Sequence, residues 1–240
     1  MILSYKPIGL TPLEHLKELI KEGKLENGKN CYAGRLDPMA HGLMIYLSNS
    51  NCKNVKNFLE LSKTYKFKIS LGVSTDSYDI LGKVNNTCNN LPTIENCISC
   101  IKKYQGKIIQ SYPKFSSINV NGKPLWKHSL DGTINDIKIP EKEINISKMK
   151  ILNHKEIDFE DFKENILYRL NLLKSKSFRN NEIINSWNNI NITKIYVIEC
   201  EADVSSGTYI RSLCNMIGND LNCGGIAYDI LRIKIGNYNL

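Results

Sequence analysis

The sequence predicts an α+β fold, and three observations lead to this prediction. Apolar residues recur at helical spacing after Thr11, a continuous apolar run at 43–47 is typical of a buried strand, and apolar and polar residues alternate at 64–71. The predicted helices and strands follow one another without a regular strand–helix–strand rhythm, which disfavours a doubly wound parallel sheet. A chain of 240 residues can bury a substantial core in a single domain.

The first helix is predicted to begin at Thr11. Thr11 can cap the helix, Pro12 suits its first position, and Glu14 can complete a capping box. Gly23 ends the apolar pattern. After the two strands named above, a polar, turn-rich stretch is predicted from Gly72 to residue 82, followed by a helix around 93–104.

The second half of the chain contains two unusual stretches. Residues 110–132 hold two prolines and two glycines, which predicts a long excursion with little regular structure, of the kind that often binds a partner. Residues 155–192 are charged and rich in asparagine, and we interpret them as a helical insertion on the solvated surface. A strand at 194–204, a helix at 208–221 and a strand at 229–236 complete the predicted order.

The formal net charge is +8, from 32 Lys and Arg against 24 Asp and Glu. This charge favours polyanionic partners such as nucleic acid, although many basic proteins bind none. No apolar run approaches the ~20 residues needed to cross a bilayer, and the N-terminus lacks the basic and apolar regions of a secretory signal. We therefore expect a soluble intracellular protein of the cytoplasm, with the nucleus or an organelle as alternatives, and no membrane partner.

The eight cysteines are expected to be free thiols, as is usual inside the cell. Cys97 and Cys100 form a Cys-x-x-Cys, which could indicate a zinc or redox site. The chain offers no second close pair of Cys or His at zinc-finger spacing. Ile94, Cys97, Ile98 and Ile101 also fall on one helical stripe, which favours core packing. We therefore expect no metal.

Asp37 lies in the most informative segment, residues 34–42. Pro38 biases Asp37 away from helical dihedrals, and the flanking glycines allow tight backbone paths, so its carboxylate should be held on a fixed loop. Taken alone, the segment favours Asp37 as a turn-forming or capping residue, because Asp-Pro pairs are common in turns.

Arg211 and Tyr65 are the other candidates for chemistry. Arg211 follows a turn at Gly207 and a candidate N-cap at Thr208, and it lies at the border of the apolar stripe of the next helix. It could be a surface charge or could reach into a cleft while its stem packs on the core. Tyr65 lies on the apolar side of its strand, where it could be a core tyrosine or could stack on a planar ligand.

Several other chemistries lack their sequence motifs. The chain contains neither a glycine-rich phosphate loop nor a Gly-x-Ser-x-Gly or His-Glu-x-x-His motif, and its four histidines show no ligand spacing. These absences disfavour nucleotide-cofactor, hydrolase and metal chemistry.

Taken together and in order, the segments resemble the TruB family of RNA pseudouridine synthases. Five collinear motifs carry this resemblance over nearly the whole chain: Lys-Pro-x-Gly-x-Thr at 6–11, Gly-x-Leu-Asp-Pro-x-Ala-x-Gly at 34–42, Lys-x-Tyr through Asp-x-x-Gly at 63–82, Ser-x-Gly-Thr-Tyr-Ile-Arg at 205–211, and Leu-Arg followed by Gly at 231–236. A weaker match to the family's RNA-gripping segment lies at 113–132.

The resemblance implies a fold and a set of site residues. It implies a mixed, mainly antiparallel sheet flanked by helices and loops, with a central RNA-binding cleft. Asp37 matches the essential aspartate, Tyr65 the tyrosine that stacks on the base, and Arg211 the arginine that keeps the aspartate charged. RNA or substrate contacts are expected from Tyr32, Arg35, Lys63, Lys123, Tyr209 and Leu231.

The implied reaction isomerises a uridine in RNA to pseudouridine and needs no cofactor. The expected substrate is the uridine at position 55 in the T-loop of tRNA. Tyr32 and Asn119 depart from the residues that are frequent in the family at their positions. The chain has no room after its last motif for the family's C-terminal RNA-binding PUA domain, so we expect one catalytic domain, residues 1–240, acting as a monomer without guide RNA. An inactive RNA-folding chaperone and an unrelated basic enzyme are the alternatives.

Overall fold

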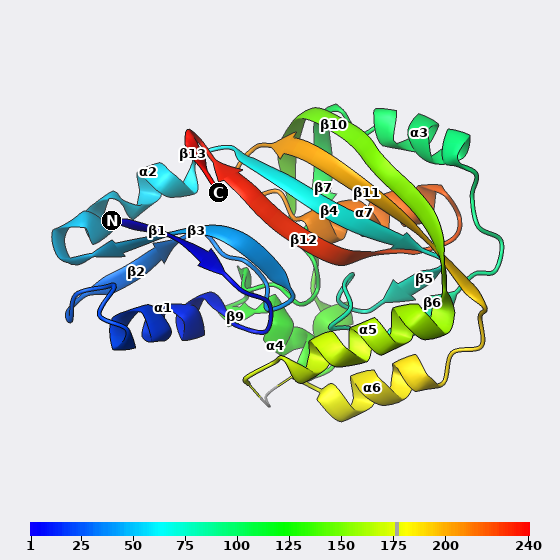
Figure 1. Ribbon diagram of the computed structural model, residues 1–240, viewed down its shortest axis with the longest axis horizontal. Helices are drawn as coiled ribbons and strands as arrows, with labels where there is room; N and C mark the ends of the chain where they lie inside the picture. Colours follow the sequence, from blue (N-terminus) through cyan, green and yellow to red (C-terminus); the bar gives the residue numbers. More distant parts are fainter. Residues whose placement is uncertain (176–177) are drawn as a thin grey trace.

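The computed structural model describes residues 1–175 and 178–240, and it confirms the predicted α+β fold (Figure 1). A nine-stranded sheet runs through the described part of the chain. In spatial order its main path is β1 (Ile2–Lys6), β3 (Ala40–Ser48), β12 (Gly225–Ile235), β4 (Lys63–Leu71), β11 (Lys194–Val204), β10 (Glu141–Asp158) and β7 (Gly106–Ser111). β2 (Asn30–Ala33) pairs with β3, and β13 (Tyr238–Asn239) pairs with β12.

The sheet is mainly antiparallel, as the family resemblance implied. β3 and β12 run parallel over three residue pairs, whereas the other neighbouring strands described in this sheet are antiparallel. Two small hairpins lie outside it, β5 (Val73–Thr75) with β6 (Val84–Thr87) and β8 (Asn119–Val120) with β9 (Lys123–Pro124).

Seven α-helices and two short 3-10 helices accompany the strands in the described residues. They are α1 (Pro12–Lys21), α2 (Val55–Leu59), α3 (Ile94–Lys102), α4 (Leu125–Leu130), α5 (Phe159–Asn171), α6 (Asn180–Asn188), α7 (Ile210–Asp220), η1 (Asn49–Asn54) and η2 (Ile134–Asp136). No helix in the described ranges is long and apolar enough to cross a membrane.

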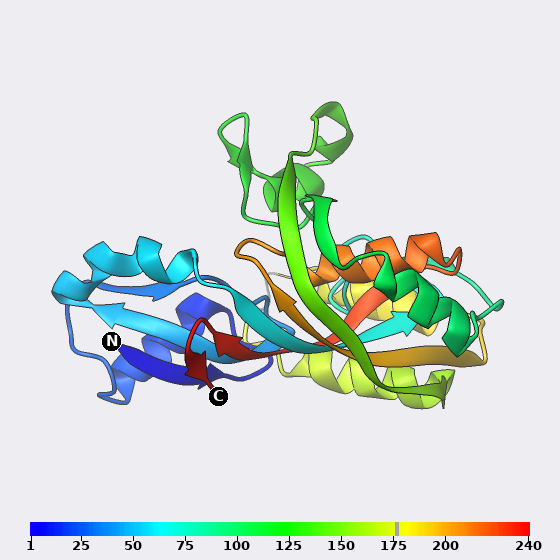
Figure 2. The same ribbon diagram turned by 90° about the horizontal axis from the view of Figure 1, so that it is seen from above.

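Buried apolar side chains form two large clusters. The first cluster joins α1, α3 and α7 to one face of the sheet, around Tyr65 and Phe67. The second cluster joins α5 and α6 to strand residues such as Val197 and Ile226. Figure 2 shows α7 and α5 on opposite sides of the sheet. The loop before β3 touches both clusters, since Leu36 belongs to the first and Met39 to the second.

The predicted start of α1 is confirmed by its hydrogen bonds. The hydroxyl of Thr11 accepts from the amide of Glu14 at 3.2 Å, and the Glu14 carboxylate accepts from the amide of Thr11 at 2.7 Å. This reciprocal pair satisfies two amides that the first helical turn leaves without partners. Gly23, just beyond the helix, has φ +70°, a left-handed conformation that favours glycine.

The interpretation of residues 155–192 as a solvated surface addition is wrong. Residues 155–158 complete β10, and the two helices that follow bury Phe162, Ile166, Ile183 and Trp187 in the second cluster. The many Asn and charged residues lie between these apolar positions and conceal their helical spacing. The segment therefore forms core on its own side of the sheet.

Residues 110–132 also hold more regular structure than predicted. Its first residues finish β7, and β8, β9 and α4 follow. His128 on α4 forms hydrogen bonds to residues on both sides of the helix. Its two ring nitrogens lie 3.0 Å from the carbonyl oxygen of Val120 and 2.9 Å from the hydroxyl of Thr133. Figure 2 shows this segment standing away from the sheet on the side of α7.

Three local predictions are corrected. Thr208 does not cap α7, because its hydroxyl donates to the carbonyl of Ser205 and Tyr209 is the residue before the helix. Strand β12 begins at Gly225, four residues before the predicted position 229. Ile98, predicted to face the core, is 40% exposed. Cys100, which was not part of the predicted stripe, is buried beside Cys97 instead.

Candidate active site

Asp37 lies on the loop between β2 and β3 and forms a two-point ion pair with Arg211. The Nε of Arg211 donates to one carboxylate oxygen at 2.7 Å, and Nη2 donates to the other at 3.2 Å. The side chain of Asp37 is 36% exposed, whereas that of Arg211 is 3% exposed. The buried guanidinium of Arg211 therefore fixes the Asp37 carboxylate, which remains accessible to a reactant from solvent.

The backbone of this loop is fixed on both sides of Asp37. The amide of Ala40 donates to the carbonyl of Asp37, and the amide of Gly9 donates to the carbonyl of Pro38 at 2.9 Å. Gly34 enters the loop with φ +85°, a conformation that a side chain would strain. The predicted rigid placement of the carboxylate is thus explained by turn geometry and by contact with the segment after β1.

Arg211 lies in the first turn of α7 and has two further acceptors. Nη1 donates to the carbonyl of Ser77 at 2.8 Å, and Nη2 donates to the carbonyl of Phe115 at 3.2 Å. Although burial acts to lower it, the charges of Asp37 and Asp79 raise the pKa of this guanidinium. The cation is therefore permanent, and its orientation is fixed by several acceptors.

Asp79 is a second carboxylate of this centre that the sequence analysis noted only as part of a motif. Its Oδ2 lies 3.8 Å from the Nε of Arg211, and its Oδ1 accepts from the Ser77 hydroxyl and from the amide of Leu81. Burial raises its pKa to about 6, against the opposing effect of Arg211. The turn-rich stretch predicted after Gly72 is therefore present, but its polar residues are buried around the arginine.

Tyr65 lies on β4 and is 7% exposed. Its ring belongs to the first cluster, which also contains Leu36, the residue before Asp37. The structure thus brings Tyr65 to the same side of the sheet as α7. This placement fits both the core role and the base-stacking role that the sequence left open.

Tyr209 is held at the start of α7 by a buried amide. The Gln110 side chain accepts from the amide of Tyr209 at 2.8 Å and donates to its carbonyl at 3.1 Å. The Tyr209 ring meets Tyr112 edge to face at 5.5 Å. Burial raises the pKa of Tyr209 to about 12, and the charge of Asp37 acts in the same direction. The phenol is therefore neutral, and the negative charge of Asp37 favours that neutral form.

The register of β12 corrects the prediction for Leu231. Leu231 pairs with Lys66, whereas Tyr65 pairs with Arg232 and Phe67 pairs with Ile230. Because side chains alternate between the faces of a sheet, Leu231 points away from the face that carries Tyr65. Ile230, 6% exposed and part of the first cluster, is the residue on that face. Alternation identifies Ile230 only once the register of β12 against β4 is known.

The remaining predicted contact residues differ in how well they can reach RNA. The Nζ of Lys63 is buried against the carbonyls of Leu59 and Leu61, so the structure gives this lysine an internal role instead of the predicted RNA contact. Lys123 forms an ion pair with Asp131 inside its own segment. The side chain of Arg35 is exposed on the same loop as Asp37, and Tyr32 is half-buried on β2.

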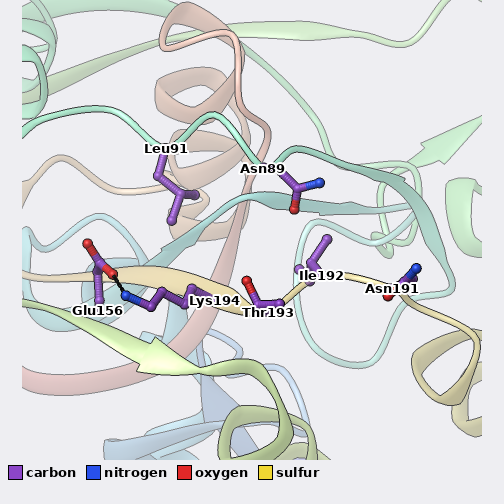
Figure 3. Close-up of a pocket in the computed structure, with 7 residues that line it drawn as sticks. All are labelled: Asn89, Leu91, Glu156, Asn191, Ile192, Thr193 and Lys194. Carbon is purple, nitrogen blue, oxygen red and sulfur yellow. Dashed lines mark hydrogen bonds and ion pairs between the residues drawn. The ribbon is translucent and has the colours of Figure 1, made fainter.

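A polar hollow at the far end of the sheet is a separate feature (Figure 3). It is lined by Asn89, Leu91, Glu156, Asn191, Ile192, Thr193 and Lys194. An exposed ion pair between Lys194 and Glu156 crosses it. Its lining shares no residue with the surroundings of Asp37. Among residues 1–175 and 178–240, no group of three or more His, Cys, Asp or Glu side chains has the arrangement of a metal site.

Comparison with known proteins gives one consistent result. Residues 22–166 match the family model described as TruB family pseudouridylate synthase (N terminal domain). The chain is 30% identical over 235 residues to tRNA pseudouridine synthase B of Clostridium kluyveri, covering 98% of this chain and 66% of that protein. It is 30% identical over 234 residues to tRNA pseudouridine synthase B of Aquifex aeolicus, covering 98% and 67%.

Solved structures show the same fold at lower identity. The crystal structure of a Cbf5–Nop10–Gar1 complex contains a chain that matches with a TM-score of 0.59 and 19% identity, over 98% of this chain and 48% of the other. A chain of an H/ACA RNP bound to a substrate RNA matches with a TM-score of 0.55 and 18% identity, over 98% and 47%. This chain thus spans about two thirds of the curated relatives and about half of these structural neighbours.

Proposed function

The chain belongs to the TruB family of pseudouridylate synthases, and on that premise we propose that it converts a uridine of tRNA to pseudouridine with Asp37 as the catalytic carboxylate. The two-point pairing of Asp37 with the buried Arg211 is the observation that supports this most strongly. Both residues occupy the motif positions of the family's aspartate and arginine. The expected target is the T-loop uridine at position 55.

The reaction rearranges bonds without a change of composition. The bond between N1 of the base and C1′ of the ribose breaks, and a bond between C5 and C1′ forms. The proton on C5 is lost, and N1 gains one. The reaction needs neither an oxidant nor a second substrate, so groups that hold the base and a carboxylate that attacks or removes a proton are sufficient.

The reacting atoms of a stacked nucleotide are shielded, so the uridine must first be turned out of the RNA, at a cost of a few kcal/mol. We assign Tyr65 to stack on the everted base, an interaction of about 1–3 kcal/mol. Tyr209 and Ile230 complete the apolar wall. Because Arg211 already holds the carboxylate in one orientation, little reorganisation is left for the moment of reaction.

The protruding segment that contains α4 is the proposed RNA-gripping element. Trp126 is 43% exposed on α4, the neighbouring Lys127 is exposed, and so is Lys138, which lies between η2 and β10. Exposed aromatic and basic side chains together bind RNA by stacking and by contact with phosphates. Arg35, two positions before Asp37, is an exposed basic side chain next to the reaction centre in sequence. We propose that residues 1–240 act as one catalytic unit, as a monomer and without guide RNA.

Incubation with an unmodified tRNA transcript, followed by mapping of pseudouridine, tests the proposal. The wild-type protein is expected to modify the T-loop uridine. Asp37→Asn keeps the shape of the side chain and should bind the same tRNA while forming no pseudouridine. Product formation by Asp37→Asn would remove the assigned role, and tRNA binding without product by the wild-type protein would favour an RNA chaperone.

A further inference from the structure

The helical segment α5–α6 contacts residues that adjoin the Asp37–Arg211 pair. Two arginines of this segment make those contacts. Arg179, just before α6, has a side chain that is 17% exposed, and Arg169, near the end of α5, has one that is 7% exposed. Arginines this buried need partners to offset the loss of water.

Arg179 binds two parts of the chain at once. Nη1 and Nη2 donate to the two carboxylate oxygens of Asp76 at 2.7 and 3.2 Å. The same guanidinium lies over the ring of Phe115, 4.3 Å from its centroid. A planar guanidinium can form such a two-point ion pair and a ring contact together, whereas an ammonium group cannot.

Both partners of Arg179 lie next to acceptors of Arg211. Asp76 precedes Ser77, whose carbonyl accepts from Arg211 at 2.8 Å. Phe115 is bound through its ring by Arg179, while its own carbonyl accepts from Arg211 at 3.2 Å. Arg211 thus binds the backbone of these two stretches of chain, and Arg179 binds side chains of the same two stretches. Without Arg179, one of the two guanidiniums that bridge these stretches would be lost, and Ser77 and Phe115 would be held together less firmly.

Arg169 reaches the other side of the catalytic loop. Nη2 donates to Oδ1 of Asp229 at 2.7 Å and to the carbonyl of Met39 at 3.4 Å, and Nη1 donates to the carbonyl of Tyr228 at 2.6 Å. The ring of His41 lies 3.3 Å from the same Asp229 oxygen. Met39 and His41 follow Asp37 by two and four positions, so this cluster anchors the loop where it enters β3.

A backbone contact adds to this anchor. The amide of Lys174, just after α5, donates to the carbonyl of Gly9, and the amide of Gly9 donates to the carbonyl of Pro38. A Cβ on Gly9 would lie 2.3 Å from the carbonyl oxygen of Leu172, so the close approach of α5 requires glycine there. Gly9 therefore links Lys174, just after α5, to Pro38, the residue that follows Asp37.

We propose that Arg179 and Arg169 are positioning residues of the catalytic centre, through which the α5–α6 segment fixes the acceptors of Arg211 and the loop of Asp37. This inference rests on the proposed function for its kinetic readout. A displacement of about 1 Å in a reacting group can cost up to a hundredfold in rate, so loss of these contacts should lower kcat while substrate binding is retained.

The main test is the Arg179→Met variant, which keeps an apolar stem over Phe115 and removes the ion pair with Asp76. We expect kcat for pseudouridine formation to fall about tenfold or more, with KM for tRNA changed less than about twofold. Asp76→Asn should cause a similar loss. The kcat of the double variant should be no lower than that of either single variant, because each single variant already removes the same ion pair.

Glu182→Gln is the matched control. Glu182 lies on α6, close to Arg179 in sequence, and forms an exposed ion pair with Lys83. The Glu182→Gln variant removes a charge from the same helix, but this side chain has no contact with Asp76 or Phe115 among the described interactions. The kcat of this variant should therefore equal that of the wild type. If Arg179→Met does not fold, Arg179→Lys keeps the charge but not the planar fork, and the same loss of kcat is expected.

Amide hydrogen exchange supplies a readout that does not depend on activity. Peptides covering 73–79 and 112–116 should exchange faster in Arg179→Met than in Glu182→Gln, and a peptide covering 36–42 should exchange faster in Arg169→Lys than in Glu164→Gln, an exposed position on α5. Unchanged exchange and unchanged kcat in the arginine variants would overturn the proposal. If the wild-type protein forms no pseudouridine, the proposed function fails, and the exchange data still decide whether these arginines position the loops.

Discussion

At the scale of single residues, the geometry of the centre depends on one guanidinium that serves Asp37, Ser77 and Phe115 together. A lysine at this position would keep a positive charge, but its compact ammonium group cannot form the two-point contact with the carboxylate while also reaching two carbonyls. The charge alone is therefore insufficient for the proposed chemistry.

Arg211→Lys should lower kcat by about a hundredfold, because removal of preorganised contacts in an active site typically has an effect of this size. The buried ammonium should leave at least one carbonyl without a donor, so the melting temperature should fall as well. Single-turnover kinetics with saturating enzyme measure the rate separately from tRNA binding. A wild-type rate would show that the two-point geometry is not needed.

The carboxyl group of Asp79 has a higher pKa in the folded protein than in the unfolded chain. Its folded-state pKa of about 6 lies above the ordinary value of 3.8. The folded protein therefore holds this proton more tightly than the unfolded chain does. The resulting stabilisation is fully present below the unfolded pKa and is lost as the pH rises through the folded pKa, from about 4 to about 6.

The Asp79→Asn variant has no such titration. Its free energy of unfolding relative to that of the wild type should therefore increase as the pH rises from about 4 to about 7. Its kcat should fall, because Arg211 loses a neighbouring carboxylate. Urea unfolding of both proteins across this pH range measures the difference, and a difference independent of pH would contradict the assigned pKa.

At the scale of elements, local signals predicted well where sequence neighbours determine the structure. The capping box at Thr11 and Glu14 starts α1 as predicted, and the strand at 194–204 matches β11. The face of Leu231 was missed because it depends on the register of β12 against β4, which is set by bulges that leave no clear mark in one sequence. The pairing of Asp37 with Arg211 came from the family resemblance, since no local pattern links residues 174 positions apart.

The helices α5 and α6 show where composition misleads. Their Asn and charged residues suggested a solvated surface, but Trp187 is fully buried beside Phe162, with ring centroids 6.0 Å apart. The apolar residues are few and large, so each contributes much to the second cluster. A stability measurement can therefore distinguish a core element from a surface addition.

Trp187→Ala should lower the free energy of unfolding by about 3–5 kcal/mol, the usual cost of truncating a large buried aromatic. Trp126→Ala is the internal comparison, because Trp126 is 43% exposed and should change stability by less than about 0.5 kcal/mol. Equilibrium denaturation of the two variants gives both values. Equal effects would mean that α6 does not contribute to the folded core.

At the scale of the whole molecule, the net charge of +8 should make RNA binding sensitive to salt. Each phosphate that a Lys or Arg neutralises releases bound counterions, so affinity falls as salt concentration rises. The association constant for tRNA should fall about tenfold or more between about 50 and 200 mM salt.

The protruding segment should carry part of this dependence. Lys127→Ala and Lys138→Ala should each reduce the slope of log K against log salt concentration by about 1 without changing which uridine is modified. Filter binding at several salt concentrations gives the slope. Unchanged slopes in both variants would place the phosphate contacts elsewhere on the molecule.

The position of β12 has a consequence for biosynthesis. This strand lies between β3 and β4, and it pairs with both. During translation, the N-terminal strands and the later strands can each assemble, but they cannot become one continuous sheet until residues 225–235 have left the ribosome. The nascent chain must therefore carry two unpaired strand edges until residues 225–235 have emerged, and chaperones that shield such edges should contact it before that point.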